Sequence, residues 1–401
     1  MLPQGNNVSY LVGNQNCALD KRGLIPFDEL VCEFLNTLSS ALLKNPETKQ
    51  FSDVVSFAFW CRKANLAKLK NEFKEKQVRL GLGLVFHIAP SNVPVNFAFS
   101  FAISILAGNA NIVRVPSKYF VQIDIICSAI KELFKLIYFK KISDMTVFIR
   151  YDKDDEITGL LSLQCDARII WGGDQTVLQI RKLPMLVKCR EVIFSDRYSF
   201  SVISAKQIIS MSPDLLNKLA INFYNDTYFM DQDACSSPRL IVWLGNSHDV
   251  KVAKERFWIS LHEVVLQKYE LAPINAMDKF TQLCRDAIDL YNLSDVIRYG
   301  NYIYCIGLND LPNTVDDLRG RFGYFYEYET EELSSVAHIV NTKYQTLTYF
   351  GVERHVFDNF VKSNRITGID RIVPIGLALD ISVIWDGYDL VRTLSRVIDI
   401  R

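Results

Sequence analysis

Residues 86–96 read Phe-His-Ile-Ala-Pro-Ser-Asn-Val-Pro-Val-Asn, and this stretch decides the fold of the chain. The residues from 81 to 88 are mostly apolar and predict a buried strand. Pro90 and Pro94 end that strand, because proline fixes φ and has no amide hydrogen to donate. The strand therefore runs into a loop.

A helix and a second strand follow the loop. Residues 95–107 are apolar on nearly every side and close on Gly108-Asn109, which is a common signal for the end of a helix. Residues 112–115 are again apolar and predict a strand. Strand, loop, helix and strand make a βαβ unit, and open parallel sheets bind ligands at the carboxyl ends of their strands. Asn92 and residues 114–118 lie at such ends.

The composition indicates a globular protein with more than one domain. The chain has 401 residues and a hydrophobic fraction of 49%, which is enough for two cores. Lys plus Arg and Asp plus Glu both number 45, so no net charge attracts nucleic acid or an anionic membrane. Nine scattered cysteines without a CxxC pair, and no basic-then-apolar start, predict a cytoplasmic protein with reduced thiols. Its longest apolar stretch is too short to span a bilayer.

The alternation of strands and helices continues along the chain and predicts an α/β fold. The later segments include an apolar C-terminal part, residues 372–400, with an amphipathic helix on Leu390, Leu394 and Val397 that suits closure of a domain or an oligomer contact. The other expected helices are 27–43, 51–76, 122–138, 175–182, 213–224 and 250–269, and the other expected strands are 145–150, 167–171, 191–203 (one or two), 239–244, 302–308 and 324–328. The charged residues 68–76 are interpreted as a solvated helix face.

Among the cysteines, Cys235 has the most polar surroundings. It follows Asp233 and precedes two serines and a proline, whereas Cys127 and Cys305 lie inside apolar runs and predict core positions. The residues alone leave two interpretations of Cys235 open, a nucleophile and a small core residue. His87 lies within a strand and is expected to be a core histidine. The five histidines have no metal-ligand spacing, so no metal site is expected.

Several motifs, in order, resemble the aldehyde dehydrogenase superfamily and within it the acyl-CoA reductase branch, the LuxC-type fatty acid reductases of bacterial luminescence. The resemblance runs from about Leu80 to the C-terminus. It rests on Ile-Ala-Pro-Ser-Asn-Val-Pro (88–94), Ala-Gly-Asn (107–109), Arg-Val-Pro-Ser-Lys (114–118), Asp-Gln-Asp-Ala-Cys-Ser-Ser-Pro (231–238), Gly-Arg-Phe-Gly (320–323), Gln-Thr-Leu-Thr-Tyr (345–349) and the stretch 368–376.

The resemblance implies an aldehyde dehydrogenase-like α/β fold in which three segments of the chain have different roles. Residues 1–197 would hold N-terminal helices and an NADP-binding Rossmann-like domain, 198–372 a catalytic domain, and 373–401 a closing or oligomerisation segment. Cys235 would carry the acyl group as a thioester, and the Asn92 side chain and the Cys235 amide would stabilise the oxyanion. The motifs 345–349 and 371–376 would line the active-site mouth or the domain junction, with plain packing equally open.

The chain departs from the hydrolytic members of the superfamily. Those enzymes carry a Glu-Leu-Gly-Gly stretch whose glutamate activates water, and residues 192–196 lack this pattern. Attack by water on the thioester should therefore be poor, although a general-base role for Glu191 or Asp196 stays open.

The resemblance also implies a nicotinamide cofactor at the strand ends. A Gly-Gly turn before a helix lets backbone amides approach a phosphate, although a simple tight turn is the alternative. Ser117 stands where an acidic residue often selects NAD, and Arg114 and Lys118 add cations, which favours NADPH. The candidate cofactor residues are Ala89, Pro90, Ser91, Arg114, Pro116, Ser117, Lys118, Gly172, Gly173 and Asp174.

The expected function is NADPH-dependent reduction of an acyl group to the aldehyde. The donor would be an acyl-CoA or an acyl-protein, with a possible acyl-activating synthetase as partner, and the protein is expected to form a homo-oligomer. Two alternatives are a CoA-acylating aldehyde dehydrogenase that works in the oxidative direction and a non-catalytic scaffold for an acyl-activating enzyme.

Overall fold

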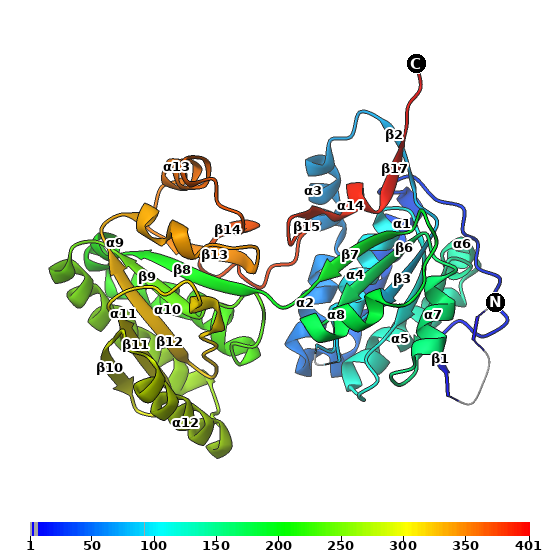
Figure 1. Ribbon diagram of the computed structural model, residues 1–401. Helices are drawn as coiled ribbons and strands as arrows, with labels where there is room; N and C mark the ends of the chain where they lie inside the picture. Colours follow the sequence, from blue (N-terminus) through cyan, green and yellow to red (C-terminus); the bar gives the residue numbers. More distant parts are fainter. Residues whose placement is uncertain (1, 4–6, 92) are drawn as a thin grey trace. The chain divides into compact units, whose positions relative to one another are not determined.

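The chain folds into two compact units, each built on a mostly parallel β-sheet (Figure 1). The structure is a computed structural model and describes residues 2–3, 7–91 and 93–401. Unit 1 comprises Met1–Ser195 and Ile381–Arg401, and unit 2 comprises Asp196–Asp380. Residues 381–401 thus belong to unit 1, and the functional roles expected for the segments 1–197, 198–372 and 373–401 stay predictions.

Unit 1 contains a six-stranded sheet in the order β1-β5-β4-β3-β6-β7. All neighbours pair in parallel except β1 with β5. Its central strand β3 is buried along its whole length, which explains its nearly continuous apolar sequence. The strands are β1 (Ser9–Val12), β3 (Leu84–Ile88), β4 (Ala110–Arg114), β5 (Thr146–Arg150), β6 (Ala167–Trp171) and β7 (Arg190–Phe194).

The helices of unit 1 follow the expected segments except α6 and α7, which the sequence analysis did not predict. The helix α4 between β3 and β4 is almost entirely buried, as its uniformly apolar sequence predicts. The single segment expected at 51–76 is divided into two helices at Cys61-Arg62. The helices are α1 (Glu29–Lys44), α2 (Ser52–Trp60), α3 (Lys63–Phe73), α4 (Asn96–Leu106), α5 (Val121–Phe134), α6 (Lys140–Ser143), α7 (Asp155–Ser162) and α8 (Asp174–Arg181).

The strand expected at 81–88 is wrong at its beginning. Its first residue ends a separate strand, β2 (Val78–Gly81), and Gly83 has a φ of +137°. The Asn109 side chain accepts the Leu82 amide hydrogen at 2.7 Å, and the Asp166 side chain accepts that of Leu84 at 2.8 Å. These amides donate to side chains instead of to the backbone of a neighbouring strand. The chain therefore leaves the strand conformation and turns between β2 and β3.

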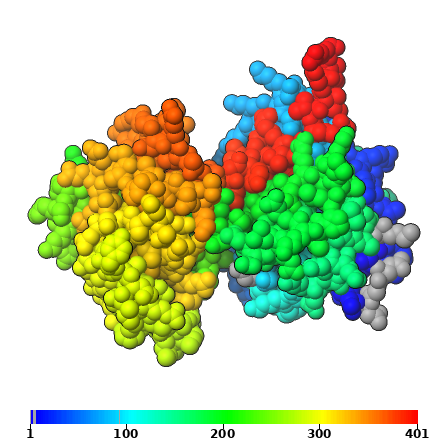
Figure 2. Space-filling view, in the orientation of Figure 1, coloured from blue at the N-terminus to red at the C-terminus, as the bar shows by residue number. Residues whose placement is uncertain are grey.

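The amphipathic helix expected near the C-terminus is also wrong. Only one turn forms, α14 (Leu390–Thr393), and then β17 (Ser395–Ile398) pairs antiparallel with β2. The Arg79 side chain fixes this pairing by donating to Ser395 Oγ at 2.9 Å. Figure 2 shows these C-terminal residues, in red, beside the light-blue residues around β2. A strand partner far away in sequence overrides the local helical spacing.

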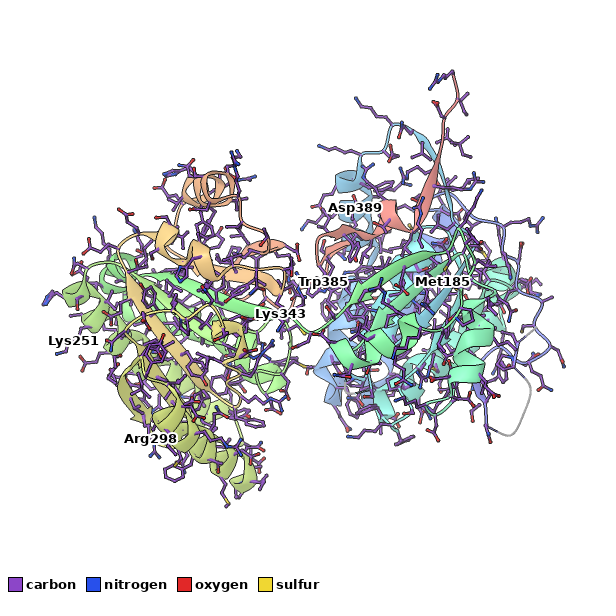
Figure 3. All side chains as sticks on the ribbon, in the orientation of Figure 1. Met185, Lys251, Arg298, Lys343, Trp385 and Asp389 are labelled. Atoms are coloured by element: carbon purple, nitrogen blue, oxygen red, sulfur yellow. The ribbon has the colours of Figure 1, made fainter. Side chains whose placement is uncertain are left out.

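A short hairpin precedes α14 and packs on unit 1. It consists of β15 (Ile384–Trp385) and β16 (Tyr388–Asp389). Figure 3 labels Trp385 and Asp389 on this segment. The Asp389 side chain accepts the amide hydrogen of Arg392 and so caps α14, which explains where that turn begins.

Unit 2 contains a seven-stranded sheet in the order β10-β11-β12-β9-β8-β13-β14, parallel except for β10. The helix α12 and the strands β10, β13 and β14 are absent from the sequence-based expectations. The strands are β8 (Tyr198–Ser204), β9 (Leu240–Leu244), β10 (Leu293–Tyr299), β11 (Ile303–Leu308), β12 (Tyr324–Thr330), β13 (Tyr344–Phe350) and β14 (Arg371–Pro374). The helices are α9 (Ala205–Ser210), α10 (Pro213–Thr227), α11 (Ser247–Lys268), α12 (Pro273–Asp289) and α13 (Arg354–Asn364).

The core assignments of single residues are confirmed. His87 is fully buried, with Nδ1 2.8 Å from Ser100 Oγ and Nε2 3.0 Å from Asn111 Oδ1. Burial lowers the pKa of His87 to about 4, so the ring is neutral near pH 7. Cys127 and Cys305 are also buried. All three residues therefore serve packing.

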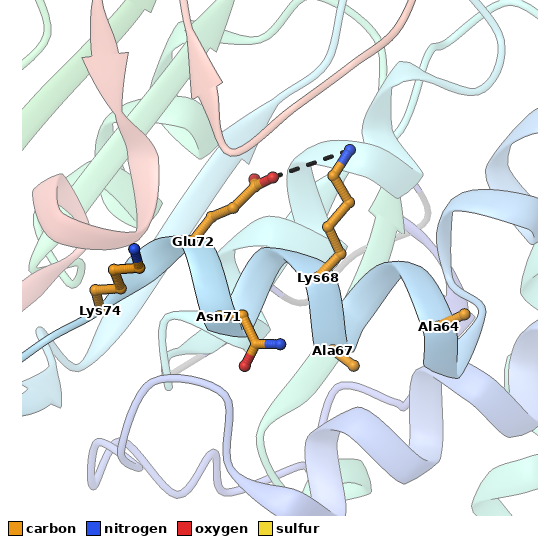
Figure 4. A pocket seen from close by; sticks show the side chains of 6 residues that line it. All are labelled: Ala64, Ala67, Lys68, Asn71, Glu72 and Lys74. Atoms are coloured by element: carbon orange, nitrogen blue, oxygen red, sulfur yellow. Dashed lines mark ion pairs between the residues drawn. The ribbon is translucent and has the colours of Figure 1, made fainter.

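The charged residues of α3 form a solvated face, as expected. Lys68 lies 3.9 Å from Glu72, and both side chains are more than half exposed. A hollow of about 620 Å³ runs along this face (Figure 4). Its lining consists of Ala64, Ala67, Lys68, Asn71, Glu72 and Lys74. No buried polar group points into it from this lining, so it has no feature of a catalytic site.

Candidate active site

Cys235 lies in a turn of unit 2, immediately before β9. The chain enters this turn from α10 through the short helix η3 (Tyr228–Met230). Asp231 and Gln232 then adopt left-handed φ angles of 52° and 64°, which reverse the chain direction. Cys235 is partly exposed, whereas the residues that follow it are buried. Cys235 thus lies where a buried segment of the chain reaches the surface.

Gln232 is the residue that holds the cysteine turn in place. Its side chain is fully buried, and both the nitrogen and the oxygen of its amide form hydrogen bonds. Its Nε2 donates to the carbonyl oxygens of Pro238 and Tyr324 at 3.0 and 3.1 Å. Its Oε1 accepts amide hydrogens from Gly323 and Tyr324 at 3.0 and 3.2 Å. Three of these hydrogen bonds join the turn to Gly323 and to Tyr324, the first residue of β12, and the fourth closes the turn on Pro238.

A serine on β8 fixes the backbone of Cys235 itself. Ser199 Oγ donates to the Cys235 carbonyl oxygen at 2.7 Å and accepts the Thr346 amide hydrogen at 3.1 Å. Thr346 belongs to the motif 345–349, which forms part of β13 beside β8. Within unit 2 this motif therefore supports the cysteine turn through strand packing.

Asp226 ties a second motif to the same support. Its carboxylate accepts amide hydrogens from Gly376 at 2.6 Å and Ala378 at 3.0 Å, and its carbonyl oxygen accepts from Ser237 Oγ at 2.7 Å. Burial raises the pKa of Asp226 to about 7, against the effect of the two amides. Gly376 has a φ of +102°, a conformation that glycine tolerates. The motif 371–376 is thus fixed to α10 near the cysteine turn.

The expected cofactor residues share one edge of the sheet of unit 1. They follow β3, β4 and β6, which are neighbouring parallel strands, so their loops leave the sheet side by side. The Ala89 amide donates to the Arg114 carbonyl oxygen at 3.1 Å and joins two of these loops. Pro116 is buried, and Ser91, Ser117, Gly173 and Asp174 are exposed. The structure brings these residues to one edge, and their binding of a cofactor stays a prediction.

The two expected cations differ in their surroundings. The Arg114 guanidinium lies 4.5 Å from the centre of the Tyr151 ring, and its Nη2 is 3.4 Å from the Tyr151 carbonyl oxygen. Lys118 is exposed, and its Nζ lies 5.3 Å from the centre of the Phe120 ring. Arg114 is therefore held against the protein, and Lys118 faces solvent.

The Gly-Gly turn leaves room for a ligand. Gly173 caps α8 without a side chain, and a Cβ added there would meet no described atom within 4 Å. Asp174 occupies the first turn of α8, where a carboxylate is favoured by the helix dipole. The start of α8 is thus not covered by a side chain at Gly173, as the approach of a phosphate would require.

Asn92 lies outside the described residues, so its expected oxyanion role stays a prediction. Among the described residues, no group of three His, Cys, Asp or Glu side chains could hold a metal ion. None of the described helices is long and apolar enough to cross a membrane.

Comparison with known families agrees with this arrangement. The sequence model of the acyl-CoA reductase (LuxC) family matches residues 32–279, which is more than half of the chain. The chain belongs to the LuxC family. The match begins before Leu80 and ends at residue 279, so the motifs at 320–323, 345–349 and 368–376 lie beyond it. No curated protein matches the chain.

Solved structures show that the LuxC-family chain has the aldehyde dehydrogenase fold. A salicylaldehyde dehydrogenase from Pseudomonas putida is 14% identical, with a TM-score of 0.60 over 90% of this chain and 79% of that one. A benzaldehyde dehydrogenase from Corynebacterium glutamicum is 11% identical, with a TM-score of 0.58 over 93% and 83%. Proline utilization A from Bradyrhizobium japonicum is 12% identical, with a TM-score of 0.61 over 92% of this chain. The LuxC-family chain spans only 42% of that protein.

Both alternative general bases of the LuxC-family chain are engaged in ion pairs. Glu191 Oε1 lies 2.5 Å from Nη2 of the fully buried Arg168, and its Oε2 lies 3.1 Å from Arg181. Asp196 lies 3.0 Å from Arg319. Both carboxylates thus have cationic partners, and a general-base role for either residue stays a prediction.

Sequence reasoning missed the residues that support the cysteine turn. Gln232 stands inside a motif that the sequence singled out, but only its left-handed φ directs its side chain toward β12. Ser199 and Asp226 carry no local signal, because their partners are far away in the sequence. One sequence signal could have indicated Asp226: an acidic residue at a position of α10 that the helical spacing of apolar residues assigns to the buried face.

Proposed function

We propose that this LuxC-family protein reduces an acyl group to an aldehyde through a thioester on Cys235. The observation that carries the proposal is a partly exposed cysteine whose turn is fixed by Gln232 and Ser199, in a chain of this family. A thiolate suits this chemistry because its acyl thioester stays reactive toward a hydride.

The reaction has two balanced steps. In the first, the Cys235 sulfur attacks the carbonyl carbon of an acyl-CoA or acyl-protein donor, and the donor thiol leaves with a proton. In the second, the thioester carbon accepts a hydride, the bond to Cys235 breaks, and the aldehyde leaves. The Asn92 amide and the Cys235 N–H would stabilise the oxyanion in both steps. With Glu191 and Asp196 in ion pairs, no described carboxylate at 191–196 would activate water against the thioester.

The hydride would come from a nicotinamide cofactor, which supplies this chemistry when bound. One fold relative, the benzaldehyde dehydrogenase from Corynebacterium glutamicum, is NAD-dependent, which supports this class of cofactor. Residues at the carboxyl edge of β3, β4 and β6 fit such a group, because Gly173 leaves open space at the start of α8. Ser117, Arg114 and Lys118 would select the 2′-phosphate of NADPH, since they offer cations and no carboxylate.

Intact-protein mass spectrometry tests the function directly. Incubation of the protein with an acyl-CoA should add one acyl mass and release free CoA, and later addition of NADPH should remove the adduct and form the aldehyde. An adduct that water removes at the same rate without NADPH would contradict reduction. An oxidative role would instead appear as aldehyde consumption that requires CoA.

Replacement of Lys118 tests the cofactor choice. Wild-type protein should bind NADPH at least about tenfold more tightly than NADH, which corresponds to about 1.4 kcal/mol. Lys118→Glu should erase or invert this preference, because a carboxylate repels the phosphate and accepts from a ribose hydroxyl. Fluorescence titration of both cofactors at one fixed salt concentration measures it. Lys141→Glu is the control for charge alone, because Lys141 is exposed on α6, which precedes β5 and so lies at the opposite edge of the sheet. Equal wild-type affinities for the two cofactors would refute the selection.

A further inference from the structure

A buried cation stands four residues after Cys235. Arg239 is 5% exposed, and its backbone amide donates to the Ser199 carbonyl oxygen at 3.0 Å. Its guanidinium makes one hydrogen bond, from Nη2 to the Gln232 carbonyl oxygen at 3.0 Å. Nε and Nη1 are buried and have no hydrogen-bond partner among the described residues. A guanidinium with five N–H groups is thus left largely unsatisfied inside unit 2.

Such an arrangement is costly unless a negative charge compensates it. Removing an ion from water costs several kcal/mol, and native proteins offset this with a partner of opposite charge. No carboxylate forms an ion pair with Arg239 among the described residues. The Tyr198 hydroxyl is also buried without a hydrogen-bond partner, and the Arg319 guanidinium lies over the Tyr198 ring at 5.4 Å. The neighbourhood is therefore poor in negative charge.

Hydrogen bonds join Arg239 to the cysteine turn, because Ser199 binds both the Arg239 amide and the Cys235 carbonyl oxygen, and the guanidinium donates to Gln232. Burial lowers the pKa of Arg239, and the positive charge of Arg319 lowers it further. Cys235 opposes these effects most strongly, followed by Tyr198 and by Asp196. Asp196 is already paired with Arg319 at 3.0 Å. A negative charge on Cys235 is thus the strongest compensation available to this cation.

The other charged groups around the turn are two carboxylates and one exposed arginine. Asp233 lies 2.9 Å from Arg321, and Asp231 accepts a hydrogen bond from the Tyr269 hydroxyl at 2.5 Å. Both carboxylates disfavour a thiolate nearby, and Arg321 is 60% exposed, so solvent screens it. Arg239 is the buried cation of the turn, where a charge acts most strongly.

We propose that Arg239 holds Cys235 in its thiolate form, so that the nucleophile needs no general base to remove its proton. This inference rests on the proposed role of Cys235 as the nucleophile. The thiol proton passes to solvent, and the sulfur keeps its electron pair for attack on the acyl carbon. When hydride converts the thioester to the aldehyde, the same thiolate is the leaving group. One cation therefore favours both acylation and release.

The pH dependence of Cys235 alkylation tests the proposal. Iodoacetamide reacts with the thiolate, and mass spectrometry of the peptide that contains Cys235 separates it from the other cysteines. Wild-type alkylation should reach half its maximum clearly below pH 8.5, the ordinary value for a cysteine. Arg239→Met should move this midpoint up by about one pH unit and slow alkylation about tenfold at pH 7, with the same rate at high pH. Arg239→Lys should give an intermediate midpoint.

Two further measurements make the outcome decisive. Arg321→Met removes an exposed cation from the same turn and should change the rate at pH 7 by less than about threefold. A wild-type midpoint at or above pH 8.5 overturns the proposal even if Arg239→Met fails to fold, and an unchanged midpoint in a folded Arg239→Met also overturns it. A low midpoint in a protein that no acyl-CoA acylates would instead refute the proposed function and leave the role of Arg239 intact.

Discussion

Cys235→Ala should lower aldehyde formation by at least roughly 10³-fold and abolish the acyl adduct. The reason is that hydride reduction requires an acyl group bound to the protein, and alanine offers no atom that can hold it. Cofactor binding should change little, because the residues expected to bind it follow strands of unit 1, whereas Cys235 belongs to unit 2. Intact mass after incubation with acyl-CoA, aldehyde formation and a cofactor titration measure the three quantities.

The chain offers a matched control for this variant. Cys284 is an exposed cysteine on α12, and Cys284→Ala should keep both the adduct and the rate of aldehyde formation. Undiminished acyl labelling of Cys235→Ala would place the nucleophile elsewhere. Loss of labelling in both variants would point to a general change in the protein rather than to one sulfur.

The second large effect is on stability, and it comes from the buried ion pair of Arg168 and Glu191 in unit 1. Glu191→Leu should lower the free energy of unfolding by about 3 to 5 kcal/mol, because it leaves the charge of Arg168 buried without its carboxylate. The Arg168 side chain is fully buried, and its remaining hydrogen bond goes from Nη1 to Ser162 Oγ at 3.1 Å. Urea denaturation followed by tryptophan fluorescence measures the change, with Trp171 on β6, the strand of Arg168, among the five reporters.

A double variant separates the pair from simple loss of packing. Arg168→Met combined with Glu191→Leu removes both charges and should regain most of the lost stability, since apolar replacements of a buried pair are often neutral. A Glu191→Leu protein of wild-type stability would contradict the structural role. If the Glu191→Leu protein kept wild-type stability but hydrolysed the thioester more slowly, Glu191 would be a general base. This is the role that the missing Glu-Leu-Gly-Gly pattern left open.

The sequence predicts the β3, α4 and β4 region well because its signals are local. Prolines end one strand, a Gly-Asn pair ends the helix, and the apolar runs are long enough to decide between helix and strand. The same reasoning fails at 390–398, where the periodicity of Leu390, Leu394 and Val397 resembles a helix but β2 supplies a strand partner. Spacing along the chain says nothing about a partner more than 300 residues away.

The candidate site shows the same limit at the level of side chains. Cys235 and the glycines at 172–173 could be identified because their residue types are unusual in their surroundings. The supports of the turn could not, since Gln232 depends on a backbone angle and Ser199 on the register between β8 and β13. Arg239 follows the cysteine motif directly, yet only its burial distinguishes it from a surface arginine.

The late return of residues 381–401 to unit 1 sets an order of events during translation. The strand β2 ends at Gly81 and emerges from the ribosome early, but its partner β17 begins only at Ser395, after the whole of unit 2. At about 5 to 20 residues per second, the roughly 300 residues between the two strands take about 15 to 60 s, during which unit 2 can already fold. Until then the edge of β2 is a template for pairing with other chains. Pairing with Ser395–Ile398 covers this edge only after the whole of unit 2 has been synthesised.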